Sequence, residues 1–269
     1  MTRICKLFSI SVCVSGLLVA QDKPVELTPF GPVTLPGTDA LYQQLLRSNL
    51  EGIGKFYMGR QISHVMGHAG ATWLERPERE KEESTTEMIK SLNLRQGDQV
   101  ADIGVGTGYI AWRMAKAIGP EGIVHGVDIE QKMLDDLEKN MKAAGIANVK
   151  GHLGTISDPK LKENSLDFVI MVDVYHEFSH PYEMMRGIVK ALKAGGRVAF
   201  VEYNGEDPKV PIKRLHKMTE AQVIKEASLF PIKHVETYGP PTEESKGKRN
   251  LPWQNVIFFE KTEVGKEDK

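Results

Sequence analysis

Cysteine is almost absent from this sequence. The 269 residues include two cysteines, Cys5 and Cys13, and both lie within residues 1–20. Beyond residue 20 the chain therefore has no thiol that could form a disulfide or bind a metal ion. Cysteine-bound zinc sites and disulfide-stabilised domains are excluded for that part of the chain.

An excess of charge of either sign is also missing. The 35 lysines and arginines nearly balance the 36 aspartates and glutamates, for a net charge of -1. Proteins that bind nucleic acid usually present a basic face that neutralises phosphates. We therefore expect no nucleic-acid partner. With 41% hydrophobic and 26% charged residues, the composition is that of an ordinary folded globular protein.

Long apolar runs are lacking as well. An uncharged run from Leu7 to Ala20 follows Arg3 and Lys6, and as a helix it would rise about 21 Å, less than a hydrocarbon core of roughly 30 Å. A basic start before a short apolar run predicts a signal peptide or membrane anchor over residues 1–20. We expect export or membrane tethering through these residues alone, or a cytoplasmic-facing protein if the leader is an uncleaved anchor.

The next part of the chain is predicted to hold a linker and a helical cover. Residues 21–38 contain four prolines and two glycines, which indicates a linker. For residues 39–92 we predict helices, because apolar residues recur at helical spacing: Leu41, Leu45, Leu46, Leu50 and Ile53. Within this cover, the segment 57–73 is expected to lie over a ligand pocket, with His64 and His68 packing there. The charged residues 76–80 are interpreted as a solvated helix start.

Between residues 93 and 262, apolar segments of strand length alternate with segments of helical period. The predicted strands lie at 99–103, 123–127, 148–152, 167–172, 197–202, 232–237 and 254–260. Alternating strands and helices predict an α/β fold, a doubly wound, mostly parallel seven-stranded sheet. The last two strands have no helix between them, so we expect an antiparallel hairpin at one edge. Residues 263–269 are predicted to be a disordered tail.

A glycine-rich loop with an acid at its start follows the first of these strands. Its sequence is Asp102-Ile103-Gly104-Val105-Gly106-Thr107-Gly108, and such glycines let the backbone turn tightly beside a ligand. A dinucleotide-binding loop would have its third glycine at Tyr109. Asp102 favours a cationic ligand over a pyrophosphate. Asp128, at the end of the second strand, is suited to accept hydrogen bonds from ribose hydroxyls. A nucleoside with a cationic amino-acid end, S-adenosylmethionine, fits both acids.

This set of motifs resembles the class I S-adenosylmethionine-dependent methyltransferases over about residues 90–261. The resemblance rests on the glycine loop, Asp128, the strand 167–172 and the segment 192–197. It implies a Rossmann-like fold, S-adenosylmethionine as the cofactor and methyl transfer as the activity. The residues that it places at the cofactor are Asp102, Gly104, Gly106, Gly108, Asp128, Ile129, Thr155 and Asp173, with Thr155 standing where the family often has an acid for the adenine amine.

The loop after the fourth strand is the predicted methyl-transfer site. It runs from Asp173 to Phe178 and opens at the edge of the sheet where ligands of such folds bind. Tyr175 and His176 are predicted to contact a small-molecule methyl acceptor, with His176 as base if the acceptor must lose a proton. An equally weighted interpretation is that His176 or Glu177 only caps the next helix. Residues 207–218, which include His216, are a second candidate wall.

Two other functions compete with a methyltransferase. One is a non-catalytic protein that binds S-adenosylmethionine. The other is a zinc hydrolase, because residues 176–180 match the H-E-x-x-H signature. That signature needs both histidines on one helical face, and Pro181 disfavours helical geometry at His180. Glu202, a conceivable further ligand, belongs to the next strand. We therefore rank the zinc hydrolase last and expect no metal site; the sequence does not indicate the oligomeric state.

Overall fold

A computed structural model of the chain describes residues 41–45, 49–240 and 251–262. The predicted leader (1–20), linker (21–38) and tail (263–269) lie outside the described residues. Among the residues that the structure describes, no helix is long and apolar enough to cross a bilayer.

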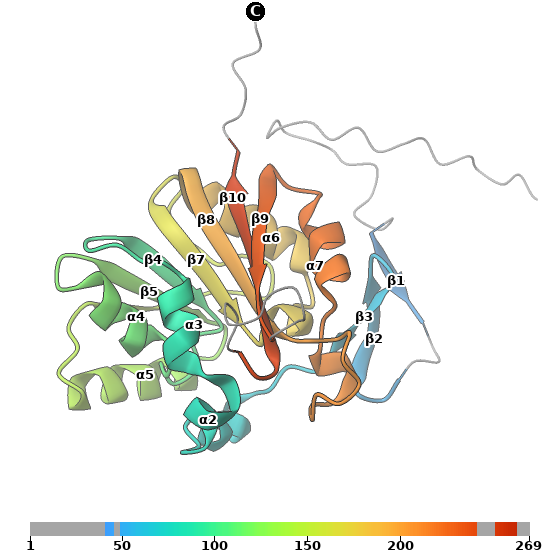
Figure 1. The fold of residues 1–269 in the computed structure, drawn as a ribbon, viewed down its shortest axis with the longest axis horizontal. Coiled ribbons are helices and arrows are strands. Elements are labelled where there is room, and N and C mark those ends of the chain that lie inside the picture. The colour runs from blue at the N-terminus through green and yellow to red at the C-terminus, as the bar shows by residue number, and fades with distance from the viewer. Residues whose placement is uncertain (1–40, 46–48, 241–250, 263–269) are drawn as a thin grey trace, which may run out of the picture.

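Seven strands form one central sheet in the order β6-β5-β4-β7-β8-β10-β9 (Figure 1). Strand β10 is antiparallel to both of its neighbours, and the other pairs are parallel. The strands are β4 (Gln99–Ile103), β5 (Ile123–Asp128), β6 (Val149–Leu153), β7 (Leu166–Val172), β8 (Leu192–Tyr203), β9 (Ile232–Tyr238) and β10 (Gln254–Lys261). The predicted seven-stranded sheet and its antiparallel edge hairpin are confirmed.

Helices cover both faces of this sheet. One face packs against α3 (Thr85–Ser91), α4 (Ala111–Ile118) and α5 (Gln131–Ala143), and the other against α6 (Pro181–Ala191) and α7 (Glu220–Ala227). The two cores share the central strands by alternation, because successive strand side chains point to opposite faces. In β8, Val198 and Phe200 belong to the α6–α7 core, whereas Ala199 and Val201 belong to the α3–α5 core.

The strand order reverses between β4 and β7. The connections after these two strands run to opposite faces of the sheet, so their first residues separate at the carboxyl edge. In open α/β sheets, ligands bind in the crevice that such a reversal leaves. The topology therefore places the glycine loop after β4 and the segment after β7 on the two sides of one crevice.

The prediction of a helical cover is wrong for its first half. Residues 42–63 form a three-stranded antiparallel sheet of β1 (Tyr42–Gln44), β2 (Gly52–Tyr57) and β3 (Arg60–Ser63). Only then come the short helices α1 (Ala71–Leu74) and α2 (Arg79–Glu83), followed by α3.

The leucines that suggested a helix do not form a buried stripe. Leu45 and Leu50 are 46% and 93% exposed, whereas the residues buried in this sheet include Tyr57 and Ile62. Strands β2 and β3 are joined through Met58-Gly59, whose φ angles are 48° and 92°. Two positive φ angles in a two-residue loop are typical of a type I′ hairpin, which glycine favours. The Met58-Gly59 turn, which favours a hairpin, thus determines the local structure, and the helical spacing of the leucines does not.

Polar contacts attach the β1–β3 sheet to the α6–α7 side of the molecule. The Arg60 side chain forms a two-point ion pair with Glu226 of α7, with Nε–Oε1 at 2.8 Å. The Tyr42 hydroxyl donates to Glu183 Oε2 of α6 at 2.6 Å. Figure 1 shows the three strands beside α7. The N-terminal strands thus pack on the main domain.

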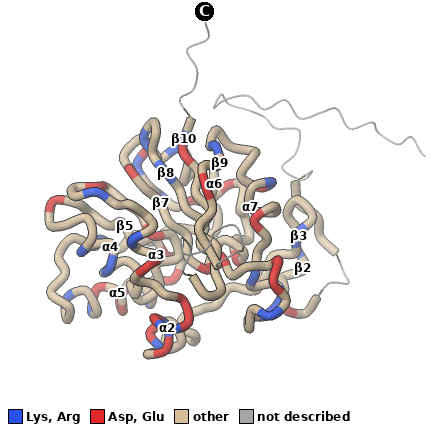
Figure 2. Tube along the Cα trace, in the orientation of Figure 1, with Lys and Arg blue, Asp and Glu red and all other residues tan. Residues whose placement is uncertain are grey.

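Charged residues of both signs are interspersed along the part of the chain visible in Figure 2. That distribution agrees with the near-zero net charge. The expectation that the protein has no nucleic-acid partner stays a prediction.

Candidate functional site

A cavity of about 600 Å³ lies at the carboxyl edge of the sheet. This volume is within the range of small-molecule sites, roughly 300–1,000 Å³. Its walls come from the glycine loop, the end of β5, the segment after β7 and residues 64–79. The prediction that the segment 57–73 contributes a pocket wall is confirmed for His64, Val65, Met66 and Trp73.

Two glycines of the loop line the cavity and need to be glycine. Gly104 and Gly106 have φ angles of +74° and +53°. A Cβ at Gly104 would lie 2.5 Å from Val174 Cγ2, and one at Gly106 would lie 2.8 Å from Leu74 Cδ1. The left-handed backbone and the missing side chains let a ligand approach the main chain closely.

Gly108 differs from the other two. It has a φ of +95°, but it does not line the cavity. A Cβ there would lie 2.4 Å from Leu137 Cδ1 of α5. The structure therefore corrects the prediction for Gly108, which allows α5 to pack closely against the loop and does not face the cofactor pocket.

The end of β5 forms a second wall of the cavity. Asp128 Oδ2 accepts a hydrogen bond from the Gly106 amide at 3.0 Å, which ties the glycine loop to β5. Burial raises the pKa of Asp128 above its usual value, although backbone hydrogen bonds oppose the shift. Ile129 and Thr155 line the cavity beside it. All three predicted residues are thus brought together on this wall.

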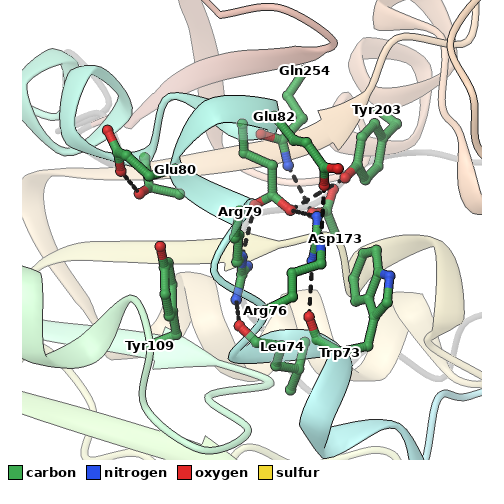
Figure 3. Close-up of polar contacts among 12 residues, drawn as sticks. Trp73, Leu74, Arg76, Arg79, Glu80, Glu82, Tyr109, Asp173, Tyr203 and Gln254 are labelled. Atoms are coloured by element: carbon green, nitrogen blue, oxygen red, sulfur yellow. Dashed lines mark hydrogen bonds and ion pairs between the residues drawn. The ribbon is translucent and has the colours of Figure 1, made fainter.

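Two buried carboxyl groups at the ends of β4 and β7 have unpaired oxygens. Asp102 Oδ2 and Asp173 Oδ1 find no hydrogen-bond partner among the described residues, while Asp173 Oδ2 accepts from Gln254 Nε2 at 2.7 Å (Figure 3). Burial raises the pKa of Asp102 to about 7, and the charge of Arg79 opposes that rise. Burial also raises the pKa of Asp173. Of the two, Asp173 lines the cavity and Asp102 does not. An ammonium group in the cavity would satisfy the unpaired oxygen of Asp173.

Arg79 lines the cavity, a position that the sequence does not predict. It is 4% exposed and lines the cavity, so the interpretation of residues 76–80 as a solvated helix start is wrong for it. Its Nε donates to Glu83 Oε2 at 2.8 Å and its Nη1 to the Leu74 carbonyl at 2.9 Å (Figure 3). The spacing of Arg79 and Glu83 predicts a helical ion pair, but no local signal shows that α2 packs over the cavity.

The arrangement fits S-adenosylmethionine. At one end, the Asp173 carboxyl group and Arg79 line the cavity and complement an amino-acid zwitterion. At the other, Asp128 offers an acceptor for ribose hydroxyls beside the apolar surface of Ile129 and Ile156. The glycines between these ends leave room for a ligand against the backbone.

A buried histidine–glutamate pair lies across the cavity from the glycine loop. His176 belongs to a 3-10 helix, Tyr175–Glu177, and is 2% exposed. Its Nδ1 lies 2.6 Å from Glu202 Oε2 of β8. Because a carboxylate only accepts, this contact places a proton on Nδ1. Burial lowers the pKa of His176, but the adjacent Glu202 carboxylate outweighs burial and the pKa is raised.

Two further side chains converge on the other nitrogen of His176. His216 Nδ1 lies 3.1 Å from His176 Nε2, and Glu177 Oε1 lies 3.9 Å from the same atom. Burial and the neighbouring His176 lower the pKa of His216 to about 4, and burial raises the pKa of Glu177 to about 7. All three residues line the cavity. The candidate wall over residues 207–218 thus contributes His216.

The prediction that Tyr175 contacts the acceptor is wrong. Tyr175 is fully buried, and its ring packs edge-on against Phe200 with centroids 4.8 Å apart. The Arg60 guanidinium lies 5.5 Å from the ring centre on the side of the β1–β3 sheet. Adjacent residues of the 3-10 helix point in different directions, so His176 lines the cavity while Tyr175 enters the core.

The H-E-x-x-H segment does not form the zinc-protease geometry. His180 precedes α6 with φ -133° and ψ 61°, which is not helical. Its ring packs against Tyr42 with centroids 6.4 Å apart. His176 and His180 therefore do not share a helical face, as the proline at 181 predicts.

Comparison with known proteins identifies the family. A family model described as a methyltransferase domain matches residues 94–251. The chain belongs to the methyltransferase domain family. A solved S-adenosylmethionine-dependent methyltransferase from Aquifex aeolicus is similar, with a TM-score of 0.66 and 19% identity, over 74% of this chain and 100% of that one. The solved structure supports the Rossmann-like fold, and the residues of the cavity fit S-adenosylmethionine as the cofactor.

The curated relatives match a smaller part of this chain. The demethylmenaquinone methyltransferase of Geobacillus kaustophilus is 28% identical over 116 residues, which is 43% of this chain and 50% of that protein. The enzyme of the same name from Listeria monocytogenes is 29% identical over 125 residues, 46% of this chain and 52% of that protein. This methyltransferase-family chain thus spans about half the length of the curated relatives it matches.

Proposed function

We propose that this protein transfers a methyl group from S-adenosylmethionine to a small-molecule acceptor. The observation that carries the proposal is that one cavity holds both the cofactor residues and a separate polar cluster. Gly104, Gly106, Asp128 and Asp173 line it together with the polar cluster of His176, Glu177 and His216. A binding protein for the cofactor alone has no need of the second cluster.

The acceptor that we propose is small and largely apolar, with one polar group. Around the polar cluster, the cavity is lined mainly by apolar side chains, among them Met66, Trp73, Val174, Phe178 and Ile212. Polar groups that are few and convergent fix the orientation of a ligand in such a site. The curated relatives are named for demethylmenaquinone, which supports a small-molecule acceptor.

The chain's own residues would hold and orient the two reactants. We assign Asp128 to the ribose, Asp173 to the ammonium group, with the buried Asp102 carboxylate as a further counter-charge, and Arg79 to the carboxylate of the cofactor. The bound cofactor supplies a methyl group that is already activated on a sulfonium. The remaining task of the protein is to align the acceptor and to exclude water. His176, held in place by Glu202, contacts the acceptor.

Calorimetry with an Asp128 variant tests the assignment of the cofactor site. Asp128→Ala should weaken S-adenosylmethionine binding by about 1–3 kcal/mol, because hydrogen bonds to a charged group are lost. Asp135→Ala is the matched control, since Asp135 is exposed on α5. Equal affinities for the wild type and Asp128→Ala would remove Asp128 from the site.

A labelled-methyl screen of cell extract tests the activity itself. The wild type should label a small-molecule fraction, and His176→Ala should lose that labelling while it still binds the cofactor. Cofactor binding without transfer to any fraction would instead favour the non-catalytic alternative.

A further inference from the structure

Three ligand-type atoms converge at the polar cluster. His176 Nε2 and His216 Nδ1 are 3.1 Å apart, and Glu177 Oε1 lies 3.9 Å from the first and 3.7 Å from the second. In the plane of the three atoms, the point equidistant from them lies about 2.1 Å from each, which matches zinc bonds to imidazole nitrogen and carboxylate oxygen. Among the described residues, these three form the only group of three or more such side chains that close together.

The surroundings of the cluster hold its side chains in place. Glu202, fully buried, fixes His176 through Nδ1 at 2.6 Å. Metal-bound histidines commonly make this contact with a carboxylate through their other nitrogen. The Met66 amide donates to Glu177 Oε1 at 3.2 Å. His216 comes from a separate 3-10 helix, Arg214–His216, so the fold brings together ligands that are 40 positions apart.

A hydrogen bond between the two imidazoles is the simpler explanation of the 3.1 Å contact. It accounts for two of the three atoms only. It does not explain why the Glu177 carboxylate is directed to within 3.9 Å of both nitrogens inside a largely apolar cavity. A cation bound by all three atoms explains the full arrangement.

We propose that His176 Nε2, His216 Nδ1 and the Glu177 carboxylate bind a divalent first-row transition ion, with Zn²⁺ as the ion that best suits this donor set. Two imidazoles and one carboxylate are a common zinc ligand set that leaves a position for an exogenous ligand. Since all three residues line the cavity, that position is accessible from it. This site replaces the expectation that the chain has no metal ion, and it uses His216 in place of His180 of the sequence motif.

The proposed metal site indicates which molecules can accept the methyl group, an inference that rests on the proposed function. An acceptor hydroxyl that reaches the ion becomes more acidic. Its O–H bond breaks, the proton passes to water, and the oxygen keeps the electron pair and coordinates the ion. His176 then serves as a ligand and not as a free base. The acceptor is therefore a small apolar molecule that carries an ionisable hydroxyl group.

Zinc binding by the metal-free full-length protein tests the site directly. The protein is titrated with Zn²⁺ against a chromophoric chelator, and with Co²⁺ for its visible absorption bands. We expect one equivalent of either ion. His216→Ala and Glu177→Gln should each lower zinc affinity at least tenfold, and Glu202→Gln should lower it about 10–100-fold.

Two histidine variants serve as matched controls. His180→Ala removes the second histidine of the sequence motif, and His125→Ala breaks a second close histidine pair among the described residues, in which His125 Nδ1 lies 2.9 Å from His152 Nε2. Both should keep wild-type zinc affinity. Substoichiometric binding by the wild type, or affinity that His216→Ala and Glu177→Gln leave unchanged, would overturn the proposal. So would a loss confined to either control.

Calorimetry with S-adenosylmethionine separates this inference from the proposed function. His216→Ala and Glu177→Gln should bind the cofactor as the wild type does, which also shows that they are folded. If the wild type binds zinc with the expected pattern but transfers no methyl group, the metal site stands and the proposed function fails. If the wild type transfers a methyl group but binds no zinc, the proposed function stands and the metal site fails.

Discussion

If Asp102 is a counter-charge of the cofactor's ammonium group, as we propose, its protonation links cofactor binding to pH. Burial raises the pKa of Asp102 from its ordinary value near 3.8 to about 7. Between these values the folded protein retains a proton that the unfolded chain has lost, so this group's contribution to stability falls as the pH rises through that window. Under the proposed assignment, the ionised Asp102 carboxylate attracts the cofactor's ammonium group. We therefore expect affinity for S-adenosylmethionine to rise roughly tenfold between about pH 5.5 and 7, where an α-amino group stays protonated.

Calorimetry across this pH range, on the wild type and on Asp102→Asn, checks the expectation. The variant should bind the cofactor more weakly at neutral pH and should lose most of the pH dependence. A wild-type slope that persists in Asp102→Asn would assign the titration to another group.

Arg79 is expected to recognise the carboxylate of the cofactor. Loss of a hydrogen bond to a charged group costs about 1.5–3 kcal/mol, so Arg79→Met should bind S-adenosylmethionine some tenfold to hundredfold more weakly. 5′-Methylthioadenosine lacks the amino-acid end, and its affinity should stay nearly constant. Arg113→Met is the control, because Arg113 stacks on Tyr109 and Trp112 outside the cavity. Equal losses for the two ligands would show that Arg79 only supports the local structure.

At the scale of elements, the attachment of the β1–β3 sheet depends on a buried ion pair. The side chains of Arg60 and Glu226 are 11% and 0% exposed. Removing one partner leaves a buried charge without its counterpart, which typically costs about 3–5 kcal/mol. Arg60→Met should lower the free energy of unfolding by roughly 3 kcal/mol in urea titrations. The exposed pair Lys90–Glu87 offers a control, and Lys90→Met should leave the unfolding curve in place. Equal stability of Arg60→Met and the wild type would contradict this account.

The strands and helices of the main domain were predictable because the spacing of their apolar residues matches the side chains that they bury in the two cores. The predicted strand at 99–103 matches β4, and five others differ from the observed strands by at most one residue at either end. Strand β8 begins at Leu192, five residues before the predicted strand 197–202. The N-terminal sheet was not predictable in the same way. Its leucines have helical spacing, but Leu50 is 93% exposed, so the spacing reflects no buried face. The Met58-Gly59 turn was the informative signal, because its glycine favours a hairpin.

At the scale of the whole molecule, the site depends on contacts between segments that are far apart in the sequence. The cavity wall of Gly104, Gly106 and Asp128 was predictable, since a local motif follows a strand at a known edge of the sheet. Arg79 and His216 reach the cavity from helices whose own sequences resemble those of solvent-exposed segments. Their roles follow from how those helices pack, which neither periodicity nor spacing encodes.

The cavity is lined by residues 64–79 and by loops of the main domain. Ligand binding should therefore stabilise these two regions together. Hydrogen exchange with and without S-adenosylmethionine measures this. We expect slower exchange over residues 64–79, which include Trp73, Leu74 and Arg79, as well as over the glycine loop at 104–108. A ligand that binds only the native state reduces the openings through which exchange occurs. Strand β9 lies at the far edge of the sheet and is the internal control. Protection of the glycine loop without any change in residues 64–79 would show that the N-terminal wall takes no part in holding the cofactor.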